Sequence, residues 1–326
     1  MPQAAILATA FNVPDRVLKN DDLKAFYETS DDWIHERSGI RERRWVEDGV
    51  GPAKLALPAV EKALAKAGLS KHDLDLIIFA TLSPEYYFPG SGCFLQELLD
   101  VPGIPALDIR QQCSGFIYGL SIADAFIKSG QYKNILLVGA EAQSKIIDLS
   151  PEGRTAGVLF GDGAGAAIVS AVEGRQGVVS THLHADGKYK DELKCKGQSS
   201  LQRPMVADMK DLYVHMNGRE VFKHAVAGMG SAIQEALDAS GWKIEEVALV
   251  IPHQANARIA VAVAQNFNIP MDKVFVNIDK YGNTTAASIP ICLAEAEQEG
   301  KLKPGDKVIL TAFGAGFTWA SASLVW

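Results

Sequence analysis

Short apolar runs alternate with longer stretches of helical periodicity along both halves of the chain. In the first half, the pattern predicts strands at residues 74–80, 104–109, 135–138 and 164–169, and helices at 58–68 and 115–129. The second half repeats this order, with predicted strands at 247–251, 274–278, 308–311 and 320–325 and predicted helices at 221–240, 255–267 and 285–299. Alternating strands and helices of this kind indicate an α/β fold with buried sheets. The repeat indicates an internal duplication.

No low-complexity linker separates the two halves. Residues 170–200 are polar and rich in turn-forming residues, and we expect them to cover the junction. We therefore predict one compact unit with an N-terminal half at residues 1–172 and a C-terminal half at 173–326. In the register of the repeat, Cys113 and Asn283 are predicted to occupy corresponding turns.

Composition and charge exclude several classes of function. The 326 residues carry a net charge of −7, which argues against a broad nucleic-acid surface. The sequence starts without a basic leader, and no apolar run approaches the length needed to cross a bilayer, so we expect a cytoplasmic protein with no membrane partner. The cysteines lie far apart without a CxxC pair, which predicts neither a metal site nor disulfides.

Cys113 lies where a predicted strand passes into a predicted helix. At such a turn the first backbone N–H groups lack intrahelical partners and the helix dipole is positive, so a thiolate there is stabilised. We therefore expect a lowered pKa for the Cys113 thiol and a role as nucleophile. The alternative for a single cysteine is a small buried hydrophobic residue.

Three further segments carry candidate chemistry at predicted strand ends. His253 follows one strand, Asn283 precedes a helix, and the loop 312–317 is rich in small residues whose N–H groups suit an oxyanion. Each has an ordinary structural alternative. His253 would be a hydrogen-bonded side chain, Asn283 a helix cap, and the loop 312–317 a tight strand connection. Two related α/β halves bring corresponding strand ends to one crevice, so these segments are predicted to meet in one pocket.

Together these segments resemble the thiolase superfamily and, within it, the β-ketoacyl-acyl-carrier-protein synthase III family. The matching stretches are residues 29–34 (TSDDWI), 38–43 (SGIRER), 113–116 (CSGF), 160–167 (FGDGAGAA), 180–187 (STHLHADG), 252–256 (PHQAN), 282–284 (GNT) and 317–319 (FTW). The resemblance spans nearly the whole chain. It implies a five-layered α-β-α-β-α fold from two duplicated halves, and a homodimer.

The resemblance also implies the reaction, an acyl transfer that initiates fatty acid biosynthesis. Cys113 would take an acyl group from an acyl-coenzyme A, and a malonyl thioester on acyl carrier protein would then decarboxylate and attack it. His253 and Asn283 would stabilise the enolate through N–H groups, and the backbone N–H groups of Cys113 and Ala315 would hold the tetrahedral oxyanion. Acyl-coenzyme A and the malonyl thioester are then substrates, and no permanently bound cofactor is implied.

Further residues acquire binding roles from the same resemblance. Trp33 and Arg154 would hold the adenine of coenzyme A, and Arg37 would lie near its phosphates. Asn256 and Gly218 would lie along the pantetheine arm, and Phe313 would also contact substrate. Phe88 would close the acyl pocket of the dimer partner, and Lys223 and Arg258 would dock the acidic carrier protein. The ordinary alternatives are core packing for Trp33 and Phe88, and a solvated charge for Arg37.

The chain departs from the family pattern at three places. Arg110, Gln111 and Gln112 precede the nucleophile where the family has small residues, which puts the acyl-chain preference in doubt. Gln265 and Asn266 replace a basic pair, which weakens steering toward an acidic carrier protein. Arg219 replaces a neutral residue beside the coenzyme A channel.

Four alternatives compete with this interpretation. A related condensing enzyme would make a specialised acyl starter or a secondary metabolite. A non-decarboxylative condensation needs a base for an α-proton, for which Glu85 is the nearby candidate. A thiol hydrolase would use His253 to activate Cys113. A non-catalytic binding protein would not need the three reactive side chains.

Overall fold

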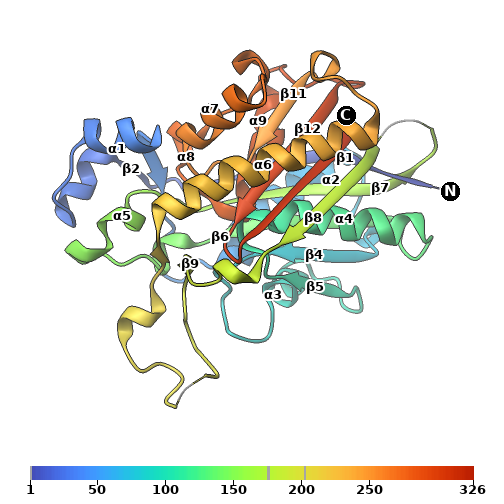
Figure 1. The fold of residues 1–326 in the computed structure, drawn as a ribbon. Coiled ribbons are helices and arrows are strands. Elements are labelled where there is room, and N and C mark those ends of the chain that lie inside the picture. The colour runs from blue at the N-terminus through green and yellow to red at the C-terminus, as the bar shows by residue number, and fades with distance from the viewer. Residues whose placement is uncertain (1, 175–176, 202) are drawn as a thin grey trace.

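Two β-sheets form the centre of the molecule in the computed structural model, which describes residues 2–174, 177–201 and 203–326. The strands are β1 (Gln3–Asn12), β2 (Val17–Lys19), β3 (Glu42–Arg44), β4 (Leu76–Ala80), β5 (Ala106–Ile109), β6 (Asn134–Glu141), β7 (Gly163–Val172), β8 (Gly177–Ala185), β9 (Leu193–Lys194), β10 (His215–Met216), β11 (Leu249–Pro252), β12 (Lys307–Gly314) and β13 (Thr318–Val325). The α-helices are α1 (Asp31–Ser38), α2 (Pro52–Ala67), α3 (Ser91–Leu99), α4 (Gly115–Lys128), α5 (Arg154–Gly157), α6 (Gly218–Ser240), α7 (Ala257–Asn266), α8 (Ile278–Tyr281) and α9 (Ser288–Gln298). Figure 1 shows their arrangement along the chain.

The strand order of the two sheets is the same. The first sheet runs β1-β7-β6-β4-β5, and the second, read from β8, runs β8-β13-β12-β11. In the first sheet, β1-β7 and β7-β6 are antiparallel and β6-β4 is parallel. In the second sheet, β8-β13 and β13-β12 are antiparallel and β12-β11 is parallel. The topology therefore confirms the predicted duplication.

The predicted strand at residues 274–278 is wrong. Only one parallel bridge, between Val250 and Val274, stands where β5 lies in the first sheet, and α8 begins at Ile278. Asn277 bonds the buried carboxylate of Glu295 at 2.7 Å instead of extending the sheet. The apolar run therefore forms a single bridge, and its one polar residue, Asn277, is used by side-chain hydrogen bonds.

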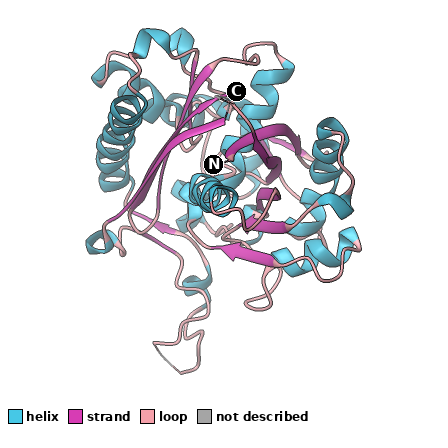
Figure 2. Cartoon of the chain, turned by 90° about the vertical axis from the view of Figure 1, so that its right-hand side faces the viewer, coloured by secondary structure: helices cyan, strands magenta, loops and turns pink. Residues whose placement is uncertain are grey.

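Helices form three layers around and between the sheets (Figure 2). Helix α4 packs against both sheets, and α9 does the same from the C-terminal half. Helices α2 and α3 cover the outer face of the first sheet, while α6 covers the outer face of the second and packs against α7. The five-layered α-β-α-β-α prediction is confirmed, with the largest apolar cluster around α4 and α9.

Two predicted segments have different bounds in the structure. Helix α2 begins at Pro52 rather than at residue 58, so Pro52 takes the first-turn position and Pro58 lies inside the helix. The segment 170–200, predicted as turns, contains strand β8 at the edge of the second sheet. Its residues are half-exposed, so no apolar run marks it. The division at residues 172 and 173 stays a prediction.

The turns that precede α4 and α9 correspond, but with a different register from the predicted one. Gln112 opens a 3₁₀ turn at Gln112–Ser114 with φ of 43°, and Thr285 opens one at Thr285–Ala287 with φ of 46°. Each turn leads directly into its helix, so Ala286 is the counterpart of Cys113. Asn283 lies three residues before Ala286, so the predicted segments correspond, but Asn283 is not the position equivalent to Cys113.

None of the helices in the described part of the chain combines the length and apolarity that a bilayer crossing requires.

Gly139 allows the strand β6 to touch the turn at Thr285–Ala287. A Cβ atom at Gly139 would collide with the carbonyl oxygen of Ala286. We expect Gly139→Ala to lower the free energy of unfolding by about 1–3 kcal/mol, because overpacking at a backbone contact cannot relax. Urea denaturation of the variant and the parent measures this. Gly187→Ala is the matched control, since a Cβ there meets nothing within 4 Å; equal losses in the two variants would contradict the prediction.

Candidate active site

Cys113, His253 and Asn283 come from three different segments, and all three are buried, with exposed fractions of 7%, 4% and 6%. Cys113 lies in the 3₁₀ turn before α4, His253 directly follows β11, and Asn283 follows α8. The turn carrying Cys113 contacts β12 and the turn at Thr285–Ala287. The backbone N–H of His253 donates to Thr311 on β12 at 2.8 Å. The strand ends therefore converge at the start of α4.

Gly314, the last residue of β12, lies directly against the cysteine. A Cβ atom at Gly314 would lie 2.9 Å from the Cys113 Cβ and 3.0 Å from its backbone nitrogen. The Ser114 hydroxyl donates to the Thr318 carbonyl at 3.4 Å, and the Thr318 hydroxyl also reaches the Ala315 carbonyl at 3.3 Å. These contacts hold the backbone around Ala315 beside the thiol.

Burial raises the pKa of Cys113 to about 12, and the charge of Glu141 adds to this effect, while its own backbone N–H opposes it. The expected lowering by the helix start is therefore wrong for this structure. A buried thiolate loses its hydration, and that loss exceeds the stabilisation by the partial charge at a helix N-terminus. Cys113 is a neutral thiol at neutral pH.

His253 is held through one of its two ring nitrogens. Nδ1 lies 2.7 Å from the Ser288 hydroxyl at the start of α9, and Nε2 is buried without a partner among the described residues. The Gln254 N–H donates to the same hydroxyl oxygen at 3.3 Å. Burial lowers the pKa of His253 to about 3, so the imidazole is neutral.

Backbone and side-chain bonds fix Asn283 from both sides. Its N–H donates to the Leu159 carbonyl at 2.8 Å, and its carbonyl accepts from Gly161 at 3.0 Å. Its side-chain oxygen accepts from the Thr285 N–H at 2.9 Å. The amide oxygen is thus occupied, and the NH₂ group is the part that can donate to a ligand.

A second cluster gathers residues predicted to bind coenzyme A. The guanidinium carbons of Arg37 and Arg154 each lie 4.7 Å from the centre of the Trp33 ring. Asn256 begins α7, where its side-chain oxygen accepts from the Arg258 N–H at 2.9 Å and its NH₂ donates to the Arg37 carbonyl at 2.9 Å. Trp33 is half-exposed and packs at the edge of an apolar cluster that contains Leu23 and Ile34.

The remaining predicted residues lie at separate positions. Gly218 begins α6 and is exposed, and Lys223 is exposed on the same helix. Phe313 packs on Phe317 with ring centres 4.8 Å apart. Phe88 is 79% exposed in the loop before α3.

Glu85, the candidate base for a non-decarboxylative condensation, uses one carboxylate oxygen to bond the backbone of α2, while its Oε2 is buried without a hydrogen-bond partner among the described residues. One of its carboxylate oxygens accepts from the Ala53 N–H at 2.7 Å, in the first turn of α2, and its side chain packs against Gly51. Glu85 therefore caps α2.

The side chains that support the site were not predicted from the sequence. Ser288 holds His253, Thr285 holds Asn283, and Gln111 hydrogen-bonds the Tyr118 hydroxyl on α4. Ser288 follows Asn283 in the sequence and lies at the start of α9. A serine near the start of a predicted helix was the available signal for a supporting role. Nothing in the sequence links it to His253, which lies 35 positions away.

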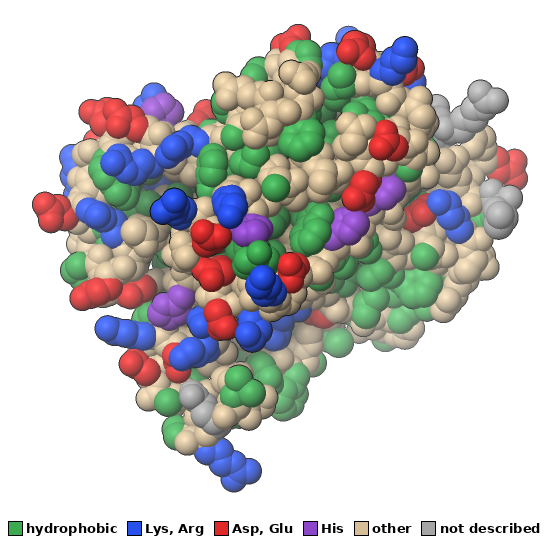
Figure 3. All heavy atoms as spheres, viewed as in Figure 1, with side chains coloured by type: hydrophobic (Ala, Val, Ile, Leu, Met, Phe, Trp, Pro, Cys, Tyr) green, Lys and Arg blue, Asp and Glu red, His purple; other side chains and the backbone are tan. Residues whose placement is uncertain are grey.

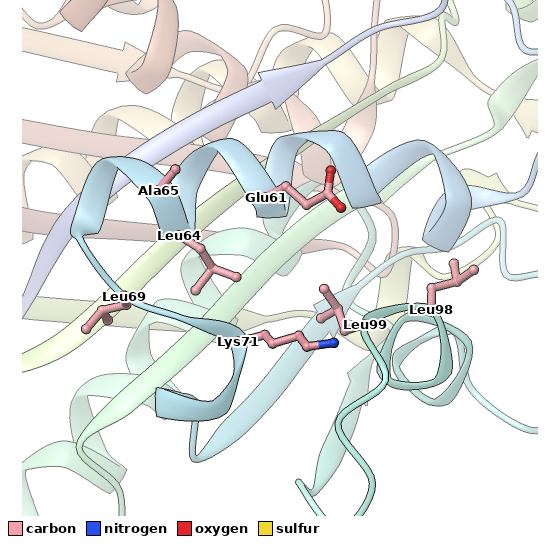
Figure 4. A pocket seen from close by; sticks show the side chains of 7 residues that line it. All are labelled: Glu61, Leu64, Ala65, Leu69, Lys71, Leu98 and Leu99. Carbon is pink, nitrogen blue, oxygen red and sulfur yellow. The ribbon is translucent and has the colours of Figure 1, made fainter.

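One surface cavity lies away from this chemistry. It has a volume of about 320 Å³ and lies between α2 and α3 on the outer side of the first sheet (Figure 4). Its lining includes Glu61, Leu64 and Leu99, and contains no predicted site residue.

Comparison with known proteins identifies the family. Residues 107–187 match the family model for 3-oxoacyl-[acyl-carrier-protein] synthase III, and residues 237–326 match the model for its C-terminal part. A curated β-ketoacyl-[acyl-carrier-protein] synthase III from Aquifex aeolicus is 48% identical over 98% of both chains.

Solved structures agree with this match along the whole chain. The crystal structure of 3-oxoacyl-[acyl-carrier-protein] synthase III from Aquifex aeolicus superposes with a TM-score of 0.92 at 46% identity, covering 99% of this chain and 100% of that one. The enzyme of the same name from Thermus thermophilus gives a TM-score of 0.92 at 42% identity, covering 99% of both chains. Full-length similarity at this level, together with the duplicated fold, shows that the chain belongs to the β-ketoacyl-acyl-carrier-protein synthase III family.

Proposed function

We propose that this acyltransferase initiates fatty acid synthesis with Cys113 as the residue that carries the acyl group. The sulfur attacks the thioester carbon of an acyl-coenzyme A, and coenzyme A leaves as its thiol with the cysteine proton. A malonyl thioester on acyl carrier protein then loses carbon dioxide, and the resulting carbanion attacks the acyl carbon and displaces the sulfur. The observation that supports this assignment is that the turn carrying Cys113 contacts β12, which bonds the backbone of His253, and the turn Thr285–Ala287, which follows Asn283.

The hydrogen bonds of His253 favour a role as donor. The Ser288 oxygen already accepts the Gln254 N–H, so its own proton is available for Nδ1 of His253. The ring proton then lies on Nε2, the nitrogen without a protein partner. A neutral Nε2–H and the NH₂ group of Asn283 suit the enolate oxygen that forms when carbon dioxide leaves. Decarboxylation itself generates the carbanion, so neither residue has to act as a base.

The backbone beside Cys113 suits the tetrahedral intermediate. We propose the N–H groups of Cys113 and Ala315 as the oxyanion hole, supported by the contact between Gly314 and Cys113. These N–H donors stabilise the negative charge that develops on the oxygen of the tetrahedral intermediate. Their contribution is larger in a buried site, where water cannot stabilise that charge.

The arginine and tryptophan cluster suits a nucleotide. We propose that the adenine of coenzyme A stacks on Trp33 with Arg154, and that Arg37 lies near the phosphates, with the pantetheine arm passing Asn256 and Gly218 toward Phe313. Both arginines stand over the Trp33 ring, so a planar base has cationic partners there. Acyl-coenzyme A and the malonyl thioester are substrates, and we propose no permanently bound cofactor. Cytoplasmic location stays a prediction.

Formation of the acyl-enzyme tests the central step. We expect mass spectrometry after incubation with acetyl-coenzyme A to show an acetyl adduct on Cys113, and no adduct in Cys113→Ala. His253→Ala should keep the adduct and lower carbon dioxide release from the malonyl thioester by about a hundredfold or more, because it removes one enolate donor. Loss of the adduct in His253→Ala would favour a Cys-His hydrolase instead.

The surface at the beginning of α6 is proposed to dock the carrier protein. Arg219 and Lys223 are exposed on α6, and Arg258 on α7 lies 5.8 Å from the Phe222 ring. Figure 3 shows basic side chains over this part of the molecule, interspersed with acidic ones. Gln265 and Asn266 are exposed near the end of α7, where a basic pair would add to the positive potential.

Charge reversal at this surface tests carrier-protein docking. We expect Lys223→Glu to lower kcat/KM with malonyl carrier protein about tenfold, because it opposes an acidic partner, and to leave the rate with malonyl-coenzyme A nearly unchanged. Steady-state assays with both acceptors measure the difference. Lys303→Glu, at an exposed position far along the chain, is the control. An equal change with both acceptors would contradict docking at α6.

The exposed edge of the first sheet is proposed to form a homodimer. Strand β5 ends the sheet and carries the exposed Leu107. Further exposed apolar side chains lie before α3 and near its end, namely Tyr86, Tyr87, Phe88 and Leu98. Exposed apolar patches of this kind mark protein interfaces. We propose that Phe88 reaches across this interface and closes the acyl pocket of the dimer partner.

A charged residue on this edge tests the dimer. We expect the parent to sediment as a dimer and Leu107→Lys to shift toward monomer, since the added charge would be buried in the interface. Sedimentation equilibrium over a range of concentrations measures both. Leu149→Lys changes a similarly exposed leucine elsewhere and should leave the dimer intact. A monomeric parent would refute this interface.

A further inference from the structure

A fully buried carboxylate, Glu141, lies at the end of β6 and has no part in the chemistry described above. The Thr81 hydroxyl, just beyond β4, donates to it at 3.2 Å, and the Ser83 hydroxyl donates at 2.6 Å. The Leu82 N–H lies 3.2 Å from both of its oxygens, and the Gln143 side-chain NH₂ donates at 3.1 Å. Burial raises the pKa of Glu141, while these hydrogen bonds oppose the shift.

The direction of these bonds identifies the charged form of Glu141. Thr81 accepts the Ser83 N–H at 3.2 Å, and Ser83 accepts the Ala142 N–H at 2.8 Å, so both hydroxyl protons are available for the carboxylate. Leu82 N–H and the Gln143 NH₂ can only donate. Every partner therefore donates, and an ionised carboxylate, which only accepts, satisfies the whole set.

The network continues from Glu141 to the turn that carries Asn283. The Gln143 NH₂ also donates to the Thr285 hydroxyl at 3.2 Å, and Thr285 bonds the Glu141 carboxylate. Thr285 is a β-branched residue at φ of 46°, a conformation that persists only where the surroundings enforce it. The N–H of this same residue holds the Asn283 amide oxygen at 2.9 Å.

We propose that Glu141 is a positioning residue for decarboxylation, which holds Thr285 in its left-handed conformation directly and through Gln143, and thereby orients the Asn283 amide. The proposal rests on the proposed function of Asn283 as an enolate donor. Glu141 itself touches no substrate. Its loss frees Thr285 to relax, and the Asn283 amide then rotates away from the position in which its NH₂ group meets the enolate.

Separate assays of the two half-reactions test this assignment on the full-length protein. We expect Glu141→Gln to release carbon dioxide from malonyl-coenzyme A about tenfold or more slowly, with kcat lowered and KM little changed, because misplacing a catalytic group affects mainly the transition state. Formation of the Cys113 acetyl adduct should not slow, since the charge that opposes the Cys113 thiolate is removed.

A second variant guards against misfolding. Gln143→Met keeps the size of the side chain and removes the NH₂ group, and the Gln143 oxygen has no partner to lose. We expect Gln143→Met to slow carbon dioxide release while leaving formation of the acetyl adduct unchanged. In the double variant Glu141→Gln with Gln143→Met, we expect the fold-loss in this rate to be smaller than the product of the two single fold-losses, because both residues act through Thr285. Asp124→Asn is the control, since it changes a buried carboxylate on α4 whose cation partner is Lys128, outside the network.

The outcomes separate the proposal from the function on which it rests. Asn283→Ala should abolish decarboxylation; if it does not, the proposed role of Asn283 fails. If Asn283→Ala abolishes decarboxylation while Glu141→Gln and Gln143→Met leave it unchanged, or slow both half-reactions equally as a merely structural change would, the positioning role of Glu141 is overturned.

Discussion

The contact between the turns that begin α4 and α9 is the constraint on which the rest of the structure depends. A Cβ atom at Gly115 would lie 3.5 Å from the Cβ of Ala286, and Gly139 of β6 approaches the backbone of the same turn. Both helices lie between the two sheets, so each turn faces the other half of the molecule. Small residues at these contacts let the backbones approach closely. The cysteine is thereby placed at the seam of the duplication, where strand ends from both halves converge.

Burial at this seam determines the electrostatics of the site. Removing Cys113 and His253 from water favours the neutral form of each side chain, so the resting site holds a thiol and a neutral imidazole rather than an ion pair. A site of this kind stabilises charge only as a substrate generates it. That property suits a reaction in which carbon dioxide leaves and an enolate forms, and it disfavours a hydrolase that depends on a standing thiolate and imidazolium.

The two halves have diverged from a common plan at equivalent places. One turn carries Cys113, the proposed nucleophile, and the other carries Ala286 at the same position. The second half instead contributes Asn283, three residues earlier, and His253 after the strand that corresponds to β4. The strand corresponding to β4 in the first half is followed by Thr81, which bonds Glu141. Equivalent strand ends thus supply a proposed catalytic residue, His253, in the second half and a residue of the Glu141 network, Thr81, in the first half.

The sequence by itself determined the α/β class, the duplication and the family, because apolar periodicity and motifs such as CSGF and GNT are local properties of the chain. It also predicted that Cys113, His253 and Asn283 meet. The tertiary structure decided the register of the repeat, since left-handed residues at Gln112 and Thr285 have no sequence signal. It also decided that β8 is a strand, since most residues of β8 are half-exposed or exposed and form no long apolar run. It reversed the expected pKa shift of Cys113, because desolvation depends on every segment packed around the sulfur. The partners of His253 and Asn283 likewise come from distant or unmarked positions, so only the folded chain shows them.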